Sequence, residues 1–321
     1  MPRKATSKSQ QISASQLAAE ILKMRLKVVR ANIKGVVARW KKNPEHLHEL
    51  RISLRRAIAS LDLFTPCCHP VKDVRWLGRK LKAVLKSTSK ARDLDVLLSR
   101  PLPKSGKAES EIRKTWISDR KKAQKSLHRH YVKLIEEKKL RQHAQSLLKS
   151  TRKFDKSSNK HVDPYAWSML QLHNRLQSLL KSIPAKPDSQ ALHKFRIAAK
   201  QLRYTAEIVA DITADSCVTD LLEQLTPIQK QLGRLQDETV AAKSLAQAGK
   251  KSDKRKSKTS SLRNHSEACH ENGIRLSEEL SAWLKSDVQP ALQKLAAYLA
   301  PPATAPEHPT KPRRKPKVRR Q

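Results

Sequence analysis

Two stretches of the sequence, 145 residues apart, carry the same pattern of residues. Residues 46–65 read HLHELRISLRRAIASLDLFT, and residues 191–210 read ALHKFRIAAKQLRYTAEIVA. In this register the matching pairs are Leu47 with Leu192, His48 with His193, Arg51 with Arg196, Ile52 with Ile197, and Arg55 with Lys200. An internal repeat of this kind restricts the fold to one in which the same local unit is built twice.

A second pair of matching segments follows at a similar distance from each block. KARDLDVLL occupies residues 90–98 and RLQDETVAA occupies residues 234–242, so Asp93 corresponds to Asp237. Two matched pairs in the same order predict a duplicated helical unit, with one copy in each half of the chain. A chain of 321 residues is long enough for two such halves.

The composition favours helices throughout the chain. Six Gly and three Phe are few for a sheet-rich fold, whereas Leu, Ala, Lys, Arg, Gln and Ser are abundant. Asn43 and Asp188 stand where helix N-caps are expected, each beside a proline. We therefore predict an all-α fold. The predicted helices span residues 14–41, 44–63, 70–88, 91–99, 107–149, 164–182, 189–212, 215–233, 237–248 and 259–299.

The predicted organisation has two helical repeats between two basic tails. We expect the first repeat at residues 14–150, a polar linker at 151–163 and the second repeat at 164–300. Residues 1–13 and 301–321 are expected to be disordered, because they are strongly basic and the C-terminal segment is also rich in proline. The N-terminal segment shares its lack of acids with organelle transit peptides, and we favour the disordered tail.

The chain carries a formal net charge of +39, from 68 Lys and Arg against 29 Asp and Glu. Such a charge attracts polyanions, and DNA, RNA, an anionic membrane surface and inorganic polyphosphate are all candidates on composition alone. No apolar run approaches the roughly 18 residues of a membrane span, so we expect no membrane insertion. Four cysteines without a CxxC pair are typical of a reducing compartment, and we expect a cytoplasmic protein.

Each repeated helix carries a stripe of cations beside its apolar face. At about 100° per residue, the stripe falls within an arc of about 60° in the first copy and about 80° in the second. Its members are His48, Arg51 and Arg55 in the first copy, and His193, Arg196, Lys200 and Arg203 in the second. No acid belongs to either stripe, whereas solvated helix faces usually mix both signs. Adjacent cations repel unless an anion lies along them, so the stripes predict a site for a linear polyanion.

Further cations extend both stripes. In the first half, Arg75, Arg79, Lys82 and Lys86 share one face of the following predicted helix. The second half offers Lys230 and Arg234 at the equivalent place. The predicted site is therefore longer than a single phosphate group.

At these residues the chain resembles the CHAD family, the conserved histidine α-helical domain. The family's signature is a His, an Arg three residues later, further Arg or Lys, and a trailing segment with (R/Q)D, all occurring twice. The matching residues are His48, Arg51, Arg55, Arg56 and Arg92-Asp93 in the first copy, and His193, Arg196, Lys200, Arg203, Tyr204 and Gln236-Asp237 in the second. The resemblance covers about residues 14–300. It departs at Ile58, where an Arg is usual, and at Thr88-Ser89, where the second copy has Leu232-Gly233.

The resemblance implies two antiparallel helical bundles related by a pseudo-twofold axis around a central basic channel. It also implies binding of inorganic polyphosphate without catalysis, and association with polyphosphate granules. The expected polyphosphate-binding residues are His48, Arg51, Arg55, Arg56, Arg79, Lys82, Lys86, Arg92, His193, Arg196, Lys200, Arg203, Lys230 and Arg234. The departures predict a less charged first half of the channel.

Two pairs of titratable residues have separate expected roles. His48 and His193 should be mostly neutral among cations near pH 7 and should gain charge when a polyanion binds, so affinity should rise below about pH 6.5. Asp93 and Asp237 could serve as a metal or general-base site, but they lie in separate copies. We expect them to orient the channel cations through salt bridges or caps.

Other functions have weaker support in the sequence. Two groups of histidines lack the Cys or carboxylate partners of a recognisable metal site, namely His46, His48 and His69, and His128 and His130. Phosphate-binding glycine loops and nucleophile motifs are absent, so we expect no enzyme, no metal and no cofactor. The alternative function is sequence-nonspecific nucleic-acid binding, through the basic helices and the KPRRKPKVRR tail, with little base stacking because aromatic residues make up only 4% of the chain.

Overall fold

The computed structural model of the protein contains eleven α-helices and no strand among the residues that it describes. The predicted all-α fold is confirmed. None of these helices combines the length and the apolar character needed to cross a bilayer. The predicted tails, apart from Ser13, and the predicted N-cap Asn43 lie outside the described residues. The structure describes residues 13–39, 45–100, 107–136, 139–157, 163–253 and 260–300.

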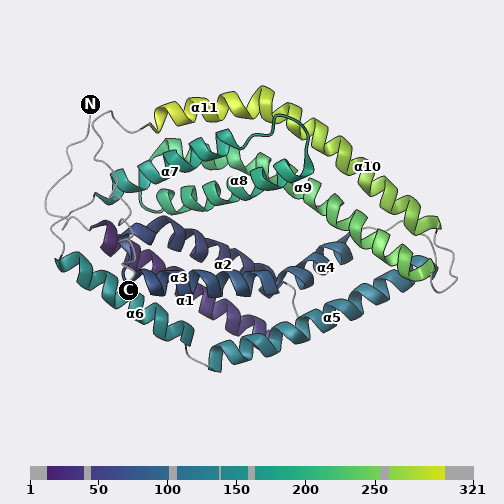
Figure 1. The fold of residues 1–321 in the computed structure, drawn as a ribbon, viewed down its shortest axis with the longest axis horizontal. Helices are drawn as coiled ribbons and strands as arrows, with labels where there is room; N and C mark the ends of the chain where they lie inside the picture. The colour runs from purple at the N-terminus through teal and green to yellow at the C-terminus, as the bar shows by residue number, and fades with distance from the viewer. Residues whose placement is uncertain are drawn as a thin grey trace, which may run out of the picture.

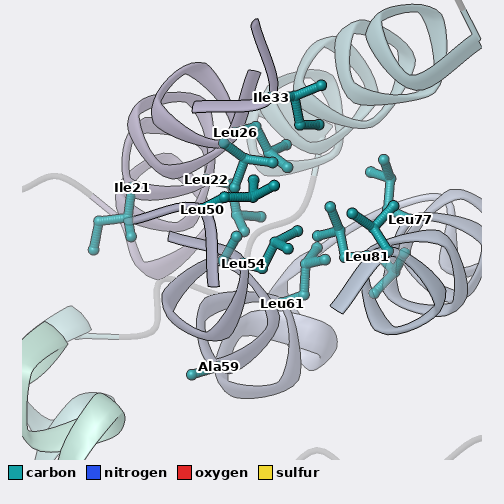
Figure 2. Close-up of a cluster of buried hydrophobic side chains, with 14 of the residues drawn as sticks. Ile21, Leu22, Leu26, Ile33, Leu50, Leu54, Ala59, Leu61, Leu77 and Leu81 are labelled. Carbon is teal, nitrogen blue, oxygen red and sulfur yellow. The ribbon is translucent and has the colours of Figure 1, made fainter. Parts of the chain in front are cut away.

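Six helices come from the N-terminal half of the chain. Their core forms mainly between α1, α2 and α3, whose leucines point toward one another (Figure 2). Apolar residues on α2 recur every three or four positions, which gives the helix one buried side. The helices are α1 (Ala14–Arg39), α2 (Glu45–Phe64), α3 (Val71–Ser87), α4 (Ser89–Ser99), α5 (Lys107–Glu136) and α6 (Lys139–Ser157), with a short 3-10 turn at Thr65–Cys67.

The C-terminal helices build a second core. It collects buried residues of α7, α8, α9 and α11. The side chain of Asp188 accepts hydrogen bonds from the backbone N–H groups of Gln190 (3.2 Å) and Ala191 (2.8 Å), which confirms Asp188 as the N-cap of α8. The helices are α7 (Pro164–Lys181), α8 (Ser189–Ala210), α9 (Ser216–Asp253), α10 (Ser260–Trp283) and α11 (Gln289–Tyr298), with a π-helical turn at Leu284–Val288.

The two sets of helices meet at two places. In the middle of the molecule α2 packs against α8, and Ile208 of α8 and Trp167 of α7 belong to the core of the N-terminal helices. At one end, α4 and α5 converge with α9 and α10 (Figure 1). A third cluster joins them there, with Leu97 and Trp116 packed against Leu245 and other residues. The two halves are thus connected by shared apolar cores, and the predicted pseudo-twofold relation stays a prediction.

Several predicted helix boundaries were wrong. Residues 107–149 form two helices, α5 and α6, and α6 continues to Ser157 through part of the predicted linker. A tertiary contact accounts for the extension, because the buried Thr151 hydroxyl exchanges hydrogen bonds of 3.2 Å with the backbone N–H and C=O of His69. In the other direction, α9 runs without a break through the segment predicted to separate two helices, because Leu232 and Leu235 pack into the C-terminal core.

Candidate functional site

Cations from both copies of the repeat come together where α2 packs against α8. The ammonium group of Lys200 on α8 interacts electrostatically with Arg196 on its own helix and with Arg51 and Arg55 on α2. Arg92 of α4 interacts in turn with His48 and Arg51. We call this group the central cluster, and it consists of His48, Arg51, Arg55, Arg92, Arg196 and Lys200.

The pKa of Lys200 reports the close packing of cations in the central cluster. Burial lowers the pKa of its ammonium group to about 7, with further lowering by Arg196, Arg55 and Arg51. An anion placed among these side chains favours the charged form of Lys200, because it supplies the counter-charge that the cluster lacks. The site is therefore suited to a ligand that brings several negative charges at once.

Arg51 is held in place by the protein itself. Its Nη1 donates to the backbone carbonyl of Leu85 at 3.3 Å and to the hydroxyl of Thr88, at the C-terminal end of α3. Thr88 is fully buried and donates in turn to the carbonyl of Leu85. Burial lowers the pKa of the Arg51 guanidinium to about 10. The Thr88 departure from the family pattern thus fixes a cation of the first copy by hydrogen bonds.

Arg196, the counterpart of Arg51, lacks this support. Leu232 stands where the first copy has Thr88, and its buried side chain offers no acceptor. The Nε of Arg196 is buried without a hydrogen-bond partner among the described residues. Burial and the neighbouring Arg55 lower its pKa. Because buried N–H groups are nearly always hydrogen-bonded, Arg196 is the cation of the cluster best prepared to donate to a ligand.

The two histidines have different surroundings. His48 is partly buried, and burial together with Arg92 lowers its pKa. His193 is exposed and lines a groove of about 650 Å³ between α8, α9 and α10, beside Arg196. The sequence repeat therefore does not produce two equivalent histidine sites.

Arg203, at the end of the second stripe, and Arg56, next to Arg55 of the first stripe, share an acidic partner. Glu207 of α8 accepts from Nε of Arg56 at 2.8 Å and from Nε of Arg203 at 3.1 Å. Arg203 also donates to Gln229 of α9 at 2.7 Å. No acid belongs to the stripes themselves, but Glu207, one turn beyond Arg203 on the same helix face, supplies a counter-charge to Arg203 and Arg56. Arg56 and Arg203 hold α2 and α8 together through this carboxylate.

Asp93 and Asp237 lie beside the central cluster. Asp93 interacts electrostatically with Arg51, Arg196 and Arg92, and Asp237 interacts with Arg196 and Arg92. Desolvation raises the pKa of both carboxyl groups despite these cations. Within the described part of the chain neither forms an ion pair within 4 Å. The predicted direct salt bridges are therefore not formed there, and both acids interact with the cluster cations at longer range.

The predicted cations on α3 are dispersed. Arg79 lines a groove between α3 and α6 that shares no residue with the central cluster. Lys82 has its ammonium 3.8 Å from the carboxylate of Asp62, with both side chains largely exposed. Lys86 is exposed beside Leu85, the residue whose carbonyl accepts from Arg51. Of these three, only Lys86 adjoins in sequence a residue that contacts the cluster.

The predicted cations on α9 lie at the surface. Lys230 is exposed, and Arg234 donates to Gln231 at 3.3 Å. Arg234 also lines a small cavity of about 230 Å³ together with Arg100, Asp237 and Glu238. This position places Arg234 near Asp237, an acid beside the central cluster, rather than among the cluster cations.

Sequence reasoning missed two ion pairs that connect the halves. Arg100, at the end of α4, pairs with Glu238 of α9 at 2.6 Å, and Arg25 of α1 pairs with Asp211 at 2.8 Å. Glu238 follows the repeated Asp237, so its position marked it as close to the site, but nothing in the sequence pointed to Arg100 as its partner. In the described residues, no three His, Cys, Asp or Glu side chains gather as a metal site.

Comparison with known proteins places this geometry in a family. Residues 20–246 match the CHAD domain family. The CHAD domain from the plant Ricinus communis has a similar fold, with a TM-score of 0.56 and 22% identity over 93% of this chain and 96% of that one. PptA from Streptomyces chartreusis is also similar, with a TM-score of 0.52 and 14% identity over 89% of this chain and 99% of that one. No curated protein sequence matches the chain.

Proposed function

The chain belongs to the CHAD domain family, and from this premise we propose that its central cluster binds inorganic polyphosphate without catalysing a reaction. The observation that carries the proposal is the convergence of cations from both repeats around Lys200. A linear chain of phosphates matches this arrangement because it presents successive negative charges to successive cations.

The cluster offers two kinds of contact to a phosphate chain. Arg55 and Arg196 present guanidinium groups, which bind phosphate oxygens through paired N–H donors. Lys200 adds a point charge between them that is restored when the anion binds. Release of counterions from the polyphosphate adds a favourable, salt-dependent contribution. Binding should therefore be strong at low salt and should weaken steeply as salt is added.

We further propose that this binding associates the protein with polyphosphate granules in the cytoplasm. A granule displays many phosphate chains, so a protein with one site of moderate affinity is retained by repeated rebinding. Retention of this kind needs no reaction at the site. This agrees with the composition of the site, which consists of hydrogen-bond donors with two acids at longer range.

The test compares two full-length variants that each lose three basic side chains. Arg55, Arg196 and Lys200 are changed together to Gln, and the control changes the exposed α5 residues Lys114, Lys121 and Lys122 to Gln. Titration with long-chain polyphosphate should show at least about a 100-fold loss of affinity for the cluster variant, because three charge-assisted contacts disappear. The control should change by less than about threefold.

Equal losses in the two variants would show that net charge, not the cluster, determines binding. Circular dichroism and urea unfolding establish that both variants fold. Competition with duplex DNA at equal phosphate concentration separates polyphosphate from the nucleic-acid alternative. The proposal requires that duplex DNA at equal phosphate concentration fail to displace long-chain polyphosphate from the central cluster.

A further inference from the structure

The outward face of α1 carries a row of four cations. Lys23, Lys27, Arg30 and Lys34 are all exposed. Their spacing places them within an arc of about 60° and along about 16 Å of the helix. This row belongs to no part of the central cluster, and none of its members belongs to the buried core of α1.

The row on α1 has almost no acidic counterpart. Among the residues that the structure describes, none of the four cations has a carboxylate within 4 Å. Glu20 is the single acid in the sequence of α1, and it already pairs with Arg152 of α6. Exposed helix faces usually mix both signs. This face is therefore short of negative charge in the same way as the predicted stripes.

A groove continues the row onto α6. It has a volume of about 570 Å³ and lies between α1 and α6, which pack against each other. Lys23 belongs to both the row and the groove, so the two form one continuous surface. The groove is lined by Lys23, Gln145, Leu148, Lys149, Arg152 and Lys153. In Figure 1, α6 lies at the outer edge of the N-terminal helices, whereas the central cluster lies where α2 faces α8.

We propose that this α1–α6 surface binds the phosphate backbone of double-stranded nucleic acid. About 16 Å of cations corresponds to about five successive phosphates of one strand, which are spaced about 3.4 Å apart along the duplex axis. Cations on two neighbouring helices contact a wider target than a single phosphate chain provides. Apart from Leu148, the row and the groove consist of Lys, Arg and one amide, so the surface contacts the backbone and does not distinguish base sequences.

A lipid surface fits this face less well. Met24 and Val28 are its only large exposed apolar side chains among the described residues. Helices that lie in a membrane interface bury a broad apolar face of Leu, Phe or Trp. Two aliphatic side chains do not supply that face, and the row of cations contributes electrostatic attraction alone.

The test uses the full-length protein and a labelled DNA duplex of about 20 base pairs. Lys23, Lys27, Arg30 and Lys34 are changed together to Gln, and the control changes the exposed α5 residues Lys114, Lys121, Lys122 and Lys125 to Gln. Fluorescence anisotropy should show at least a tenfold loss of affinity for the α1 variant near 0.1 M salt. Its slope of log affinity against log salt should fall by about three, and the control should change by less than about twofold.

Three results would overturn the proposal. Equal losses in both variants would mean that total charge alone attracts the duplex. Unchanged binding by the α1 variant would assign the duplex to another part of the chain. Loss of anionic vesicle binding by the α1 variant, with duplex binding retained, would identify a lipid surface instead.

The two sites can be tested separately. The α1 variant should keep its affinity for long-chain polyphosphate, and the Arg55, Arg196 and Lys200 variant should keep its affinity for the duplex. If the cluster variant loses duplex binding and the α1 variant does not, both anions use one site and the α1–α6 surface is excluded. Failure of the polyphosphate proposal leaves this comparison unaffected.

Discussion

Lys200 is the residue that most directly reports the electrostatics of the central cluster. Its pKa of about 7 means that roughly half of the ammonium groups are neutral near pH 7. A bound polyanion raises this pKa, so binding above pH 7 must be accompanied by uptake of a proton. Below pH 7 the group is charged in both states and contributes its full attraction. The affinity contributed by Lys200 is therefore complete below about pH 7 and is lost as pH rises above it.

We expect the affinity for polyphosphate to fall by up to about tenfold between pH 7 and pH 8. Calorimetric titration in two buffers with different ionisation enthalpies measures the protons taken up. Lys200→Arg should abolish this pH dependence, because arginine stays charged. Since the pKa of His48 is also lowered, a further rise in affinity is expected below about pH 6.5. Proton uptake unchanged in Lys200→Arg would show that another group titrates.

Arg51 and Arg196 occupy equivalent positions in the two copies of the repeat but have different roles. We expect Thr88→Val to lower the free energy of unfolding by about 1–2 kcal/mol, because it removes a buried hydroxyl that bonds Arg51 and Leu85. Arg196→Gln should leave stability nearly unchanged and reduce polyphosphate affinity, because Nε of Arg196 has no hydrogen bond to lose within the described structure. Urea unfolding and binding titrations on both variants measure the contrast. A large stability loss in Arg196→Gln would contradict it.

The site residues on α2 and α8 could be predicted from the sequence, because the repeat and the helical period place them on one face. Their partners could not. Thr88 lies 37 residues from Arg51, and the sequence registers it only as a departure from the family pattern. From the sequence, that departure predicts a less charged first half of the channel. The structure shows instead that Thr88 accepts a hydrogen bond that holds Arg51 in place.

At the scale of elements, the start of α8 controls the position of the second stripe. The carboxylate of Asp188 accepts from two backbone N–H groups in the first turn. We expect Asp188→Ala to lower the free energy of unfolding by about 1 kcal/mol. Glu223→Ala on the exposed face of α9 is the matched control and should change stability by less than about 0.5 kcal/mol. Equal effects would mean that the cap does not stabilise α8.

Helix identity was easier to predict than helix ends. Periodic apolar positions predicted which of the described segments are helical, because burial of one face needs only local spacing. They did not predict the divisions, since α5 with α6 and α10 with α11 were each predicted as one helix, and α9 as two. The ends depend on contacts that are distant in sequence. Thr151 stabilises the C-terminal extension of α6 through its hydrogen bonds to His69. The core residues Leu232 and Leu235 stabilise α9 on both sides of Gly233, so the helix continues there. Neither contact leaves a local signal in the sequence.

At the scale of the whole molecule, a carboxylate joins the two copies. Glu207 accepts from Arg56 of α2 and Arg203 of α8, and its side chain is only 17% exposed. We expect Glu207→Gln to lower the free energy of unfolding by about 1–3 kcal/mol, because two partly buried cations lose their counter-charge. The same change should increase polyphosphate affinity by adding a net positive charge beside the cluster.

Chemical denaturation and polyphosphate titration on the same samples check the Glu207 prediction. Glu223→Gln, an exposed acid on α9, has the same change in charge and should alter neither quantity appreciably. If Glu207→Gln weakens binding, the account of Glu207 changes. The ion pairs of Glu207 would then raise polyphosphate affinity, by organising the cluster, more than its negative charge lowers that affinity. The repeat predicted two halves of the chain, but the ion pairs between them followed only from the structure.

The central claim is that side chains from both copies of the repeat grip one phosphate chain. The most direct measurement is a structure of the full-length protein with bound polyphosphate. We predict phosphate oxygens of a single chain within about 3 Å of both the Arg55 guanidinium on α2 and the Arg196 guanidinium on α8. A chain bound elsewhere, for example along α3 or on the α1–α6 surface, with Arg55 and Arg196 left without phosphate contacts, would contradict the account.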